Sequence, residues 1–216
     1  MAINNSDLKK NVFDAGKSLA IFAIVASALV ALTFISTEST IEENERETLL
    51  KTLNELIPEG FYNNDIYDDN IVIDSPELNY RNKPITVYRA KLDENPVAAV
   101  LSVTAPDGYS GAIHMLIAIR ANESIAGVRV VSHKETPGLG DGIEIEKSYW
   151  ISLFDDKSMI DPEEKKWAVK KDGGIFDQLT GATITPRAVV NMTKKSLLYF
   201  IDNKHKIFET PENAPS

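Results

Sequence analysis

The 216-residue chain contains no cysteine. This absence excludes structural disulfides, cysteine-ligated iron–sulfur clusters and haem attached through cysteine. Histidine is nearly as scarce, because the sequence holds only His114, His133 and His205. Any redox chemistry would therefore depend on an organic cofactor, or on a few histidine and carboxylate metal ligands. Three scattered histidines do not favour a metal site, and we expect none.

Positive charge is also in deficit, since 23 Lys and Arg stand against 32 Asp and Glu, a formal net charge of −9. A nucleic-acid-binding surface needs clustered Lys and Arg, so we expect no nucleic-acid partner. Acidic residues gather in the loop 61–70, where Asp65, Asp68 and Asp69 suggest calcium at first sight. Their spacing does not match an EF-hand loop, and we interpret them as a solvated run of charge.

One long stretch, residues 18–35, carries no charge at all and is rich in Ala, Ile, Leu, Val and Phe. As a helix it would be about 27 Å long, close to the ~30 Å of a bilayer's hydrocarbon core. We therefore predict a single transmembrane helix over 18–37. Lys9, Lys10 and Lys17 precede it, whereas acidic residues follow it directly. This asymmetry predicts that the N-terminal segment 1–17 is cytoplasmic.

The alternative is a cleaved signal peptide, because Ala26-Ser27-Ala28 has the small-x-small form of a cleavage site. Cleavage there would leave an apolar run on the mature end, and the span is longer than an ordinary signal core. We favour a retained anchor. In a Gram-negative cell it would be a single pass through the inner membrane, with the main domain in the periplasm.

Residues 38–58 are expected to form a stalk helix. Five apolar residues recur there at the spacing of one helix face: Leu49, Leu50, Leu53, Leu56 and Ile57. Pro58-Glu59-Gly60 supplies the stop signal. We interpret this face as packing on the following domain rather than as a docking surface.

The next part of the chain is rich in β-branched and apolar residues, interrupted by short polar turns. Four strands are predicted, at 85–91, 97–104, 112–120 and 125–133. Short connections favour antiparallel neighbours. The fold class is therefore α+β: a twisted antiparallel sheet with flanking helices, forming a domain over 59–209 that ends in a polar tail, 210–216. His114 is expected on the less buried face of its strand.

Between the sheet and the last helix the pattern is weaker. Asp141 is expected to cap a helix that contains Tyr149 and Trp150. Trp167 and Val169 indicate a short strand. Pro137-Gly138 predicts a type II turn in which Gly138 has positive φ.

A polar stretch stands directly before the last helical pattern: Asp177-Gln178-Leu179-Thr180-Gly181-Ala182-Thr183-Ile184-Thr185-Pro186. Thr185 is the predicted N-cap, and Pro186 suits the first helical position. Thr183 then lies two residues before a helix start. Unpaired amides and the positive end of the helix dipole favour a phosphate there.

These residues also carry a family resemblance. Asp177-x-x-Thr180-Gly181-Ala182-Thr183 resembles the flavinylation motif of proteins with FMN esterified to threonine. His133-Lys134-Glu135-Thr136-Pro137-Gly138-Leu139-Gly140 is similar to a loop of the same FMN-binding domain, and Gly108-Tyr109-Ser110-Gly111 is a weaker third match. With the anchor, their order resembles the G subunit of the Rnf-type ion-translocating electron-transport complex, from the anchor to about Ile207.

The resemblance implies a membrane-anchored, electron-carrying subunit of a ferredoxin/NAD-linked oxidoreductase. FMN would be joined to Thr183 as a phosphodiester by a separate flavin transferase, and the other partners would be membrane subunits of the complex. It implies no independent catalytic acid or base. The cofactor-binding residues would be Asp177, Thr180, Gly181, Ala182, Thr183, Thr185, His133, Glu135, Thr136, Pro137, Gly138, Leu139 and Gly140.

Two alternatives stay open on sequence alone. The C subunit of the sodium-translocating NADH:quinone reductase shares these motifs, although the modest length of the chain favours the Rnf type. A non-redox anchored assembly protein would use the Thr-Gly-Ala-Thr turn only to start a helix.

Overall fold

The computed structural model describes residues 5–209. The polar tail expected at 210–216, like the first four residues of the N-terminal segment, lies outside the described residues. The chain separates into two units, one that runs up to Leu49 and one that begins at Leu50.

The first unit consists of one helix, α1 (Asn5–Leu56), whose last turns belong to the second unit. By length and composition this helix could cross a membrane. Large apolar side chains such as Leu19 and Phe22 are more than two-thirds exposed. Hydroxyl groups within the apolar segment, including those of Thr33 and Ser36, donate to the carbonyl four residues earlier. They therefore need no solvent partner.

The helix has no break where the sequence suggested an anchor followed by a stalk. Residues 38–56 contain neither glycine nor proline, so nothing in the backbone interrupts the hydrogen bonding. The helix ends at Leu56, just before Pro58-Glu59-Gly60, as the stop signal predicted.

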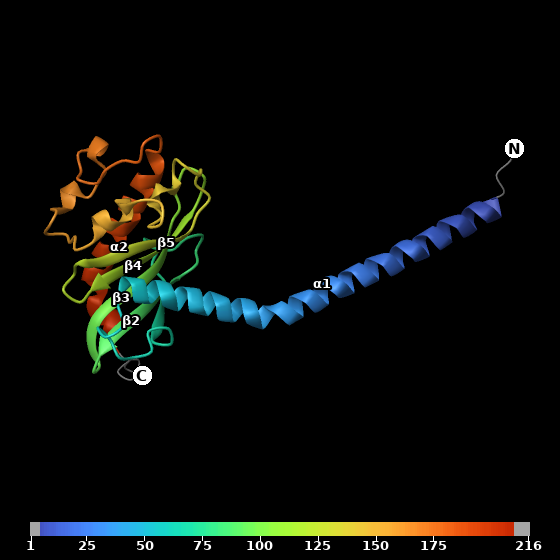
Figure 1. Cartoon of the computed structure of the whole chain (residues 1–216), viewed down its shortest axis with the longest axis horizontal. Helices are drawn as coiled ribbons and strands as arrows, with labels where there is room; N and C mark the ends of the chain where they lie inside the picture. Colours follow the sequence, from blue (N-terminus) through green and yellow to red (C-terminus); the bar gives the residue numbers. More distant parts are fainter. Residues whose placement is uncertain (1–4, 210–216) are drawn as a thin grey trace. The chain divides into compact units, whose positions relative to one another are not determined.

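The second unit is built on one antiparallel sheet whose strands follow each other in sequence order (Figure 1). The strands are β1 (Asn70–Ile73), β2 (Ile85–Leu92), β3 (Asn95–Ala105), β4 (Ile113–Arg120) and β5 (Ile125–Ser132). The four predicted strands correspond to β2–β5, and β1 adds an edge strand. The α+β fold class is confirmed.

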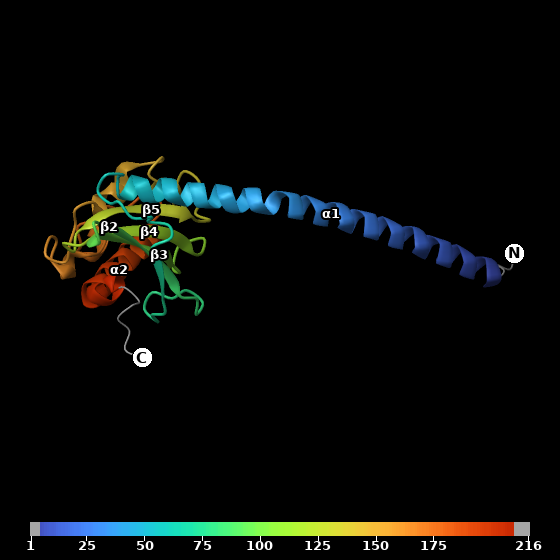
Figure 2. The same cartoon turned by 90° about the horizontal axis from the view of Figure 1, so that it is seen from below.

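One face of the sheet carries the main core. Val87, Leu101 and Ile117 point into it and are fully buried. The C-terminal helix α2 (Ile184–Phe208) covers this face and contributes buried residues such as Leu197 and Phe200. Figure 2 shows α2 on one side of the sheet and the last turns of α1 on the other.

The opposite face has a smaller apolar cluster beneath the end of α1. Leu53, Leu56 and Ile57 are at most 4% exposed, as expected of a stalk that packs on the domain. A Cβ added to Gly127 of β5 would lie only 2.9 Å from Leu56 Cδ2, so helix and strand are in close contact. His114 is exposed, as predicted for its side of β4.

Residues 141–176 differ from the prediction because they form four short 3-10 helices instead of an α-helix and a strand. These are η1 (Asp141–Ile143), η2 (Tyr149–Phe154), η3 (Glu164–Lys166) and η4 (Lys170–Asp172). Asp141 caps no α-helix, since its carboxylate accepts a hydrogen bond from the amide of Gly138 (2.7 Å).

The strand expected at Trp167 and Val169 is also wrong, because only one bridge forms there, between Val169 and Phe176. Trp167 instead packs its ring against Phe176, with centroids 5.2 Å apart, and Phe176 stacks on Phe154 at 4.6 Å. Burial of these rings, rather than a strand ladder, holds the segment in place.

Helix α2 begins earlier than predicted. Thr183 occupies the N-cap position, and Pro186 is the third helical residue rather than the first. Proline is tolerated there because first-turn amides have no intrahelical acceptor. Thr185 is not the cap, since its hydroxyl donates to Glu135 Oε2 (2.5 Å) and the residue is fully buried.

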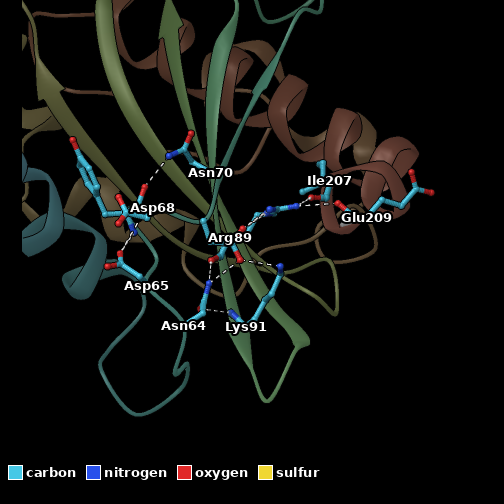
Figure 3. A network of polar contacts seen from close by, with 10 residues as sticks. Asn64, Asp65, Asp68, Asn70, Arg89, Lys91, Ile207 and Glu209 are labelled. Atoms are coloured by element: carbon cyan, nitrogen blue, oxygen red, sulfur yellow. Dashed lines mark hydrogen bonds and ion pairs between the residues drawn. The ribbon is translucent and has the colours of Figure 1, made fainter. Parts of the chain in front are cut away.

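The acidic loop 61–70 is also more than a solvated run of charge, because Asp69 is the centre of a polar network. Figure 3 shows its partners Arg89 and Lys91 together with residues of this loop. Its carboxylate accepts from Arg89 Nε (2.5 Å) and forms an ion pair with Lys91 Nζ (2.8 Å). Arg89 and Lys91 are each 6% exposed. Arg89 also donates to the carbonyl of Glu209 after the end of α2 (3.0 Å). The network therefore ties this loop to β2 and α2.

Candidate functional site

The three sequence motifs meet at one pocket, with a volume of about 340 Å³. Residues from the loop after β3, the loop after β5 and the first turn of α2 line it. They are Tyr109, Glu135, Thr136, Leu139, Gly140, Gly181, Ala182, Thr183, Ile184 and Thr185. Segments more than 70 positions apart in the sequence thus form one site.

Thr183 stands where α2 begins, on the wall of this pocket. It is partly exposed, and its side chain makes no capping hydrogen bond. The first-turn amides and the positive end of the helix dipole are at the same place. Thr183 therefore presents an uncommitted hydroxyl in a setting that favours a phosphate group.

The two neighbouring threonines differ from Thr183. The hydroxyl of Thr185 is buried and bonded to Glu135. Thr180 is exposed in the turn closed by the hydrogen bond from the Ala182 amide to the Leu179 carbonyl (3.1 Å), and it does not line the pocket.

The loop after β5 forms the predicted type II turn. The amide of Leu139 donates to the carbonyl of Thr136 (3.1 Å), and Gly138 has φ of 78°. A Cβ added to Gly138 would meet nothing within 4 Å, and neither Pro137 nor Gly138 lines the pocket. The glycine of this loop whose backbone closely approaches a neighbouring side chain is Gly140, where an added Cβ would lie 2.8 Å from Glu135 Oε2.

His133 lies outside the pocket and supports the loop. Its Nδ1 accepts the amide hydrogen of Glu135 (3.0 Å), so in the neutral ring the proton is on Nε2. Nε2 lies 2.7 Å from Glu144 Oε1 and donates to it. Both ring nitrogens are thus used to hold the loop.

Asp177 also lies outside the pocket. Its carboxylate forms an exposed ion pair with Lys170 (2.5 Å), and its carbonyl accepts from Trp150 Nε1 (2.7 Å). These contacts attach the start of the motif to the short helices before it. Of the predicted site residues, the structure therefore does not bring Asp177, Thr180, His133, Pro137 or Gly138 to the pocket wall.

Two apolar residues that line the pocket were not among the predicted site residues, namely Tyr109 and Ile184. They are 69% and 45% exposed, and Leu139 beside them is 47% exposed. The glycines that flank Tyr109-Ser110 were the available signal. No signal in the sequence indicated Ile184, because a single apolar residue at the start of a helix cannot be distinguished in sequence from a core residue.

Comparison with known proteins agrees with this geometry. Residues 108–198 match the model of the FMN-binding domain family, and residues 1–56 match that of the RnfG N-terminal region. The chain is 44% identical over 209 residues to the G subunit of the ion-translocating oxidoreductase complex of Pseudoalteromonas atlantica, covering 97% of both chains. It is 48% identical over 196 residues to the protein of the same name from Pseudomonas aeruginosa, covering 91% of both.

The chain belongs to the family of G subunits of ion-translocating oxidoreductase complexes. It is accordingly an FMN-binding electron-transport subunit of a redox complex, which favours the Rnf type over the two alternatives left open by the sequence.

The residues at the pocket fit FMN. The helix start offers amides for the phosphate, and Tyr109, Leu139 and Ile184 offer apolar surface for the ring. Small-molecule pockets have volumes of roughly 300–1,000 Å³, so this one lies at the lower end. It would hold FMN in part and leave some of the ring at the surface.

Proposed function

We propose that FMN is bound covalently to Thr183 through a phosphodiester. The observation that carries this proposal is the contrast between Thr183 and Thr185. Both line the pocket, but Thr185 is fully buried and bonded to Glu135, whereas Thr183 is partly exposed and its hydroxyl is free of that carboxylate. Attachment through Thr185 would require breaking a buried hydrogen bond to a carboxylate.

Attachment needs a separate enzyme. Within residues 5–209 no hydrogen bond joins the Thr183 hydroxyl to a carboxylate or imidazole that could serve as its base. A flavin transferase would supply that base and FAD as the donor. The Thr183 oxygen forms a bond to the FMN phosphorus, the pyrophosphate bond of FAD breaks, and AMP leaves. Asp177, Thr180 and Gly181 lie at the surface beside Thr183, where such an enzyme could recognise them.

When bound, FMN would supply one-electron transfer. The protein's own residues would place and shield the ring: Thr183 fixes one end, and Tyr109, Leu139 and Ile184 exclude water from part of its surface. The open rim leaves an edge available to another redox subunit. No acid–base pair is required. The electron transfer of the complex is proposed to be linked to ferredoxin and NAD.

The same proposal places the domain outside the cytoplasm. The apolar part of α1 would span the inner membrane once, with residues 1–17 in the cytoplasm and the FMN domain in the periplasm. Covalent attachment suits that compartment, because free FMN is scarce there and a dissociable cofactor would be lost.

The first test is retention of flavin after unfolding. Protein co-expressed with a flavin transferase should remain yellow after acid precipitation, and its intact mass should exceed the chain mass by one FMN less one water. A precipitate without colour and a mass equal to the bare chain would contradict covalent attachment. Flavin released into the supernatant would show a non-covalent site instead.

The second test concerns topology. Protease added to the periplasmic side of inner-membrane preparations should cut exposed loops of the domain and spare the segment with Lys9, Lys10 and Lys17. Immunoblotting against tags at the two ends would identify the fragments. A soluble chain that begins after Ala28 would instead establish a cleaved signal peptide.

A further inference from the structure

Glu135 is the most connected side chain of the pocket. It is 5% exposed. One carboxylate oxygen, Oε1, accepts from the amide of Ser110 (2.9 Å), and the other, Oε2, accepts from the hydroxyl of Thr185 (2.5 Å). A single carboxylate thus joins the loop after β3, the loop after β5 and the first turn of α2.

The surrounding backbone closes tightly around this carboxylate. A Cβ added to Gly108 would lie 2.9 Å from Oε1, and one added to Gly140 would lie 2.8 Å from Oε2. Among the side chains that the structure describes, no Lys, Arg or His forms an ion pair with Glu135. A buried carboxylate without a cation costs stability. Its two hydrogen bonds offset part of that cost and fix the carboxylate in one position.

The loop that Glu135 holds carries the aromatic side chain of the pocket. Tyr109 directly precedes Ser110, whose amide is bonded to Glu135, and no other aromatic residue lines the pocket within the described chain. On the other side, Thr185 lies two residues after Thr183. Glu135 therefore connects the residue next to Tyr109 with a residue two positions from Thr183.

We propose that Glu135 is a positioning residue that locks the Tyr109 loop onto the first turn of α2, so that Tyr109 stacks on a flavin held at Thr183. The inference rests on the proposed function. Glu135 acts through Ser110 and Thr185, whereas Tyr109 contacts the ring. A supporting shell of this kind has to hold a site to within about 0.5 Å.

Flavin fluorescence tests the contact. A phenol in contact with the excited flavin ring quenches the flavin fluorescence, because the phenol donates an electron to the ring and the electron then returns to the phenol. Full-length protein with FMN attached should be weakly fluorescent, and Tyr109→Leu should define the unquenched level. Glu135→Gln and Thr185→Val should both lose quenching and approach that level, while Thr185→Ser, which keeps the hydroxyl, should resemble the wild type.

The matched control is Glu144→Gln. Glu144 is bonded to His133 of the same loop but lies outside the pocket, so this change should leave quenching intact. In a Tyr109→Leu background, Glu135→Gln and Thr185→Val should have no further effect on fluorescence, since the quencher is absent. If these substitutions instead loosened the whole fold, they would change the flavin fluorescence even in the Tyr109→Leu background.

The covalent flavin content of each variant is measured first by intact mass. No flavin on the wild-type chain would contradict the proposed function itself. Full attachment with unchanged quenching in Thr185→Val overturns only the positioning role, and this variant decides the matter if Glu135→Gln does not fold. Unchanged quenching in Thr185→Val together with a redox potential that shifts only in Glu135→Gln would assign Glu135 a direct electrostatic effect instead and overturn the proposal.

Discussion

Replacement of Thr183 by Val should abolish covalent FMN completely. Valine keeps the branched shape of threonine but lacks the oxygen to which the phosphate would be bonded. Because the Thr183 side chain makes no capping hydrogen bond, the free energy of unfolding should change by no more than about 0.5 kcal/mol. Intact mass after co-expression with the transferase, together with thermal unfolding, measures both quantities.

Thr180→Val is the matched control. Thr180 belongs to the same motif but lies in the exposed turn and does not line the pocket. FMN should therefore still be attached to Thr180→Val, more slowly if the transferase recognises Thr180. A Thr183→Val chain that still has the mass of the flavin adduct would move the attachment site. In that case Thr180 and Thr185 would be replaced in turn to find it.

The second large effect is expected at Asp69. Asp69→Asn would leave Arg89 and Lys91 buried without their shared negative charge. Removal of one partner from a buried ion pair costs roughly 3–5 kcal/mol, and the side chain of Asp69 is 18% exposed, so we expect about 3 kcal/mol. In a domain of this size that corresponds to a decrease of roughly 6–12 °C in Tm.

Asp68→Asn provides the comparison, because Asp68 is adjacent and exposed. Asp68→Asn should change the free energy of unfolding by no more than about 0.5 kcal/mol. Thermal unfolding of the full chain in detergent measures both variants. Equal Tm values for the two would show that the network contributes nothing to stability.

The same network predicts a dependence on pH. Burial alone would raise the pKa of Asp69, but hydrogen bonds and charges from Lys91 and Arg89 outweigh burial and hold the pKa below its ordinary value of 3.8. The contribution of Asp69 is therefore fully present above pH 3.8 and is lost as the pH falls through the lower, folded-state value. The Tm difference between wild type and Asp69→Asn should accordingly shrink below pH 3.8.

Much of the fold followed from local patterns. The uncharged run at 18–35 indicated the apolar helix. Runs of β-branched and apolar residues between polar turns indicated β2–β5 in nearly their observed bounds. The type II turn at Gly138 was predictable because Pro and Gly restrict the backbone within a few residues. The family resemblance of three motifs likewise identified the loops that form the pocket.

The start of α2 was predicted wrongly for a physical reason. Thr185 is a good local cap, but its hydroxyl is used by Glu135, which lies 50 residues earlier. The prediction for residues 141–176 was wrong for a similar reason, because ring packing among Phe154, Trp167 and Phe176 replaced the expected strand. In both places a contact distant in sequence outweighed a local preference.

The sequence by itself thus determined the apolar helix, the antiparallel sheet and the family motifs, because each depends on residues close together along the chain. Only the tertiary structure decided which hydroxyl is free and which carboxylate is buried. Thr183 and Thr185 are the same residue type two positions apart, and Asp68 and Asp69 are adjacent. What separates them is the partner that the fold brings to each: Glu135 to Thr185, and Arg89 with Lys91 to Asp69. When a polar side chain is buried, its contribution to the free energy of folding depends on the groups that take the place of its hydrating water molecules. In this protein those groups come from distant parts of the chain.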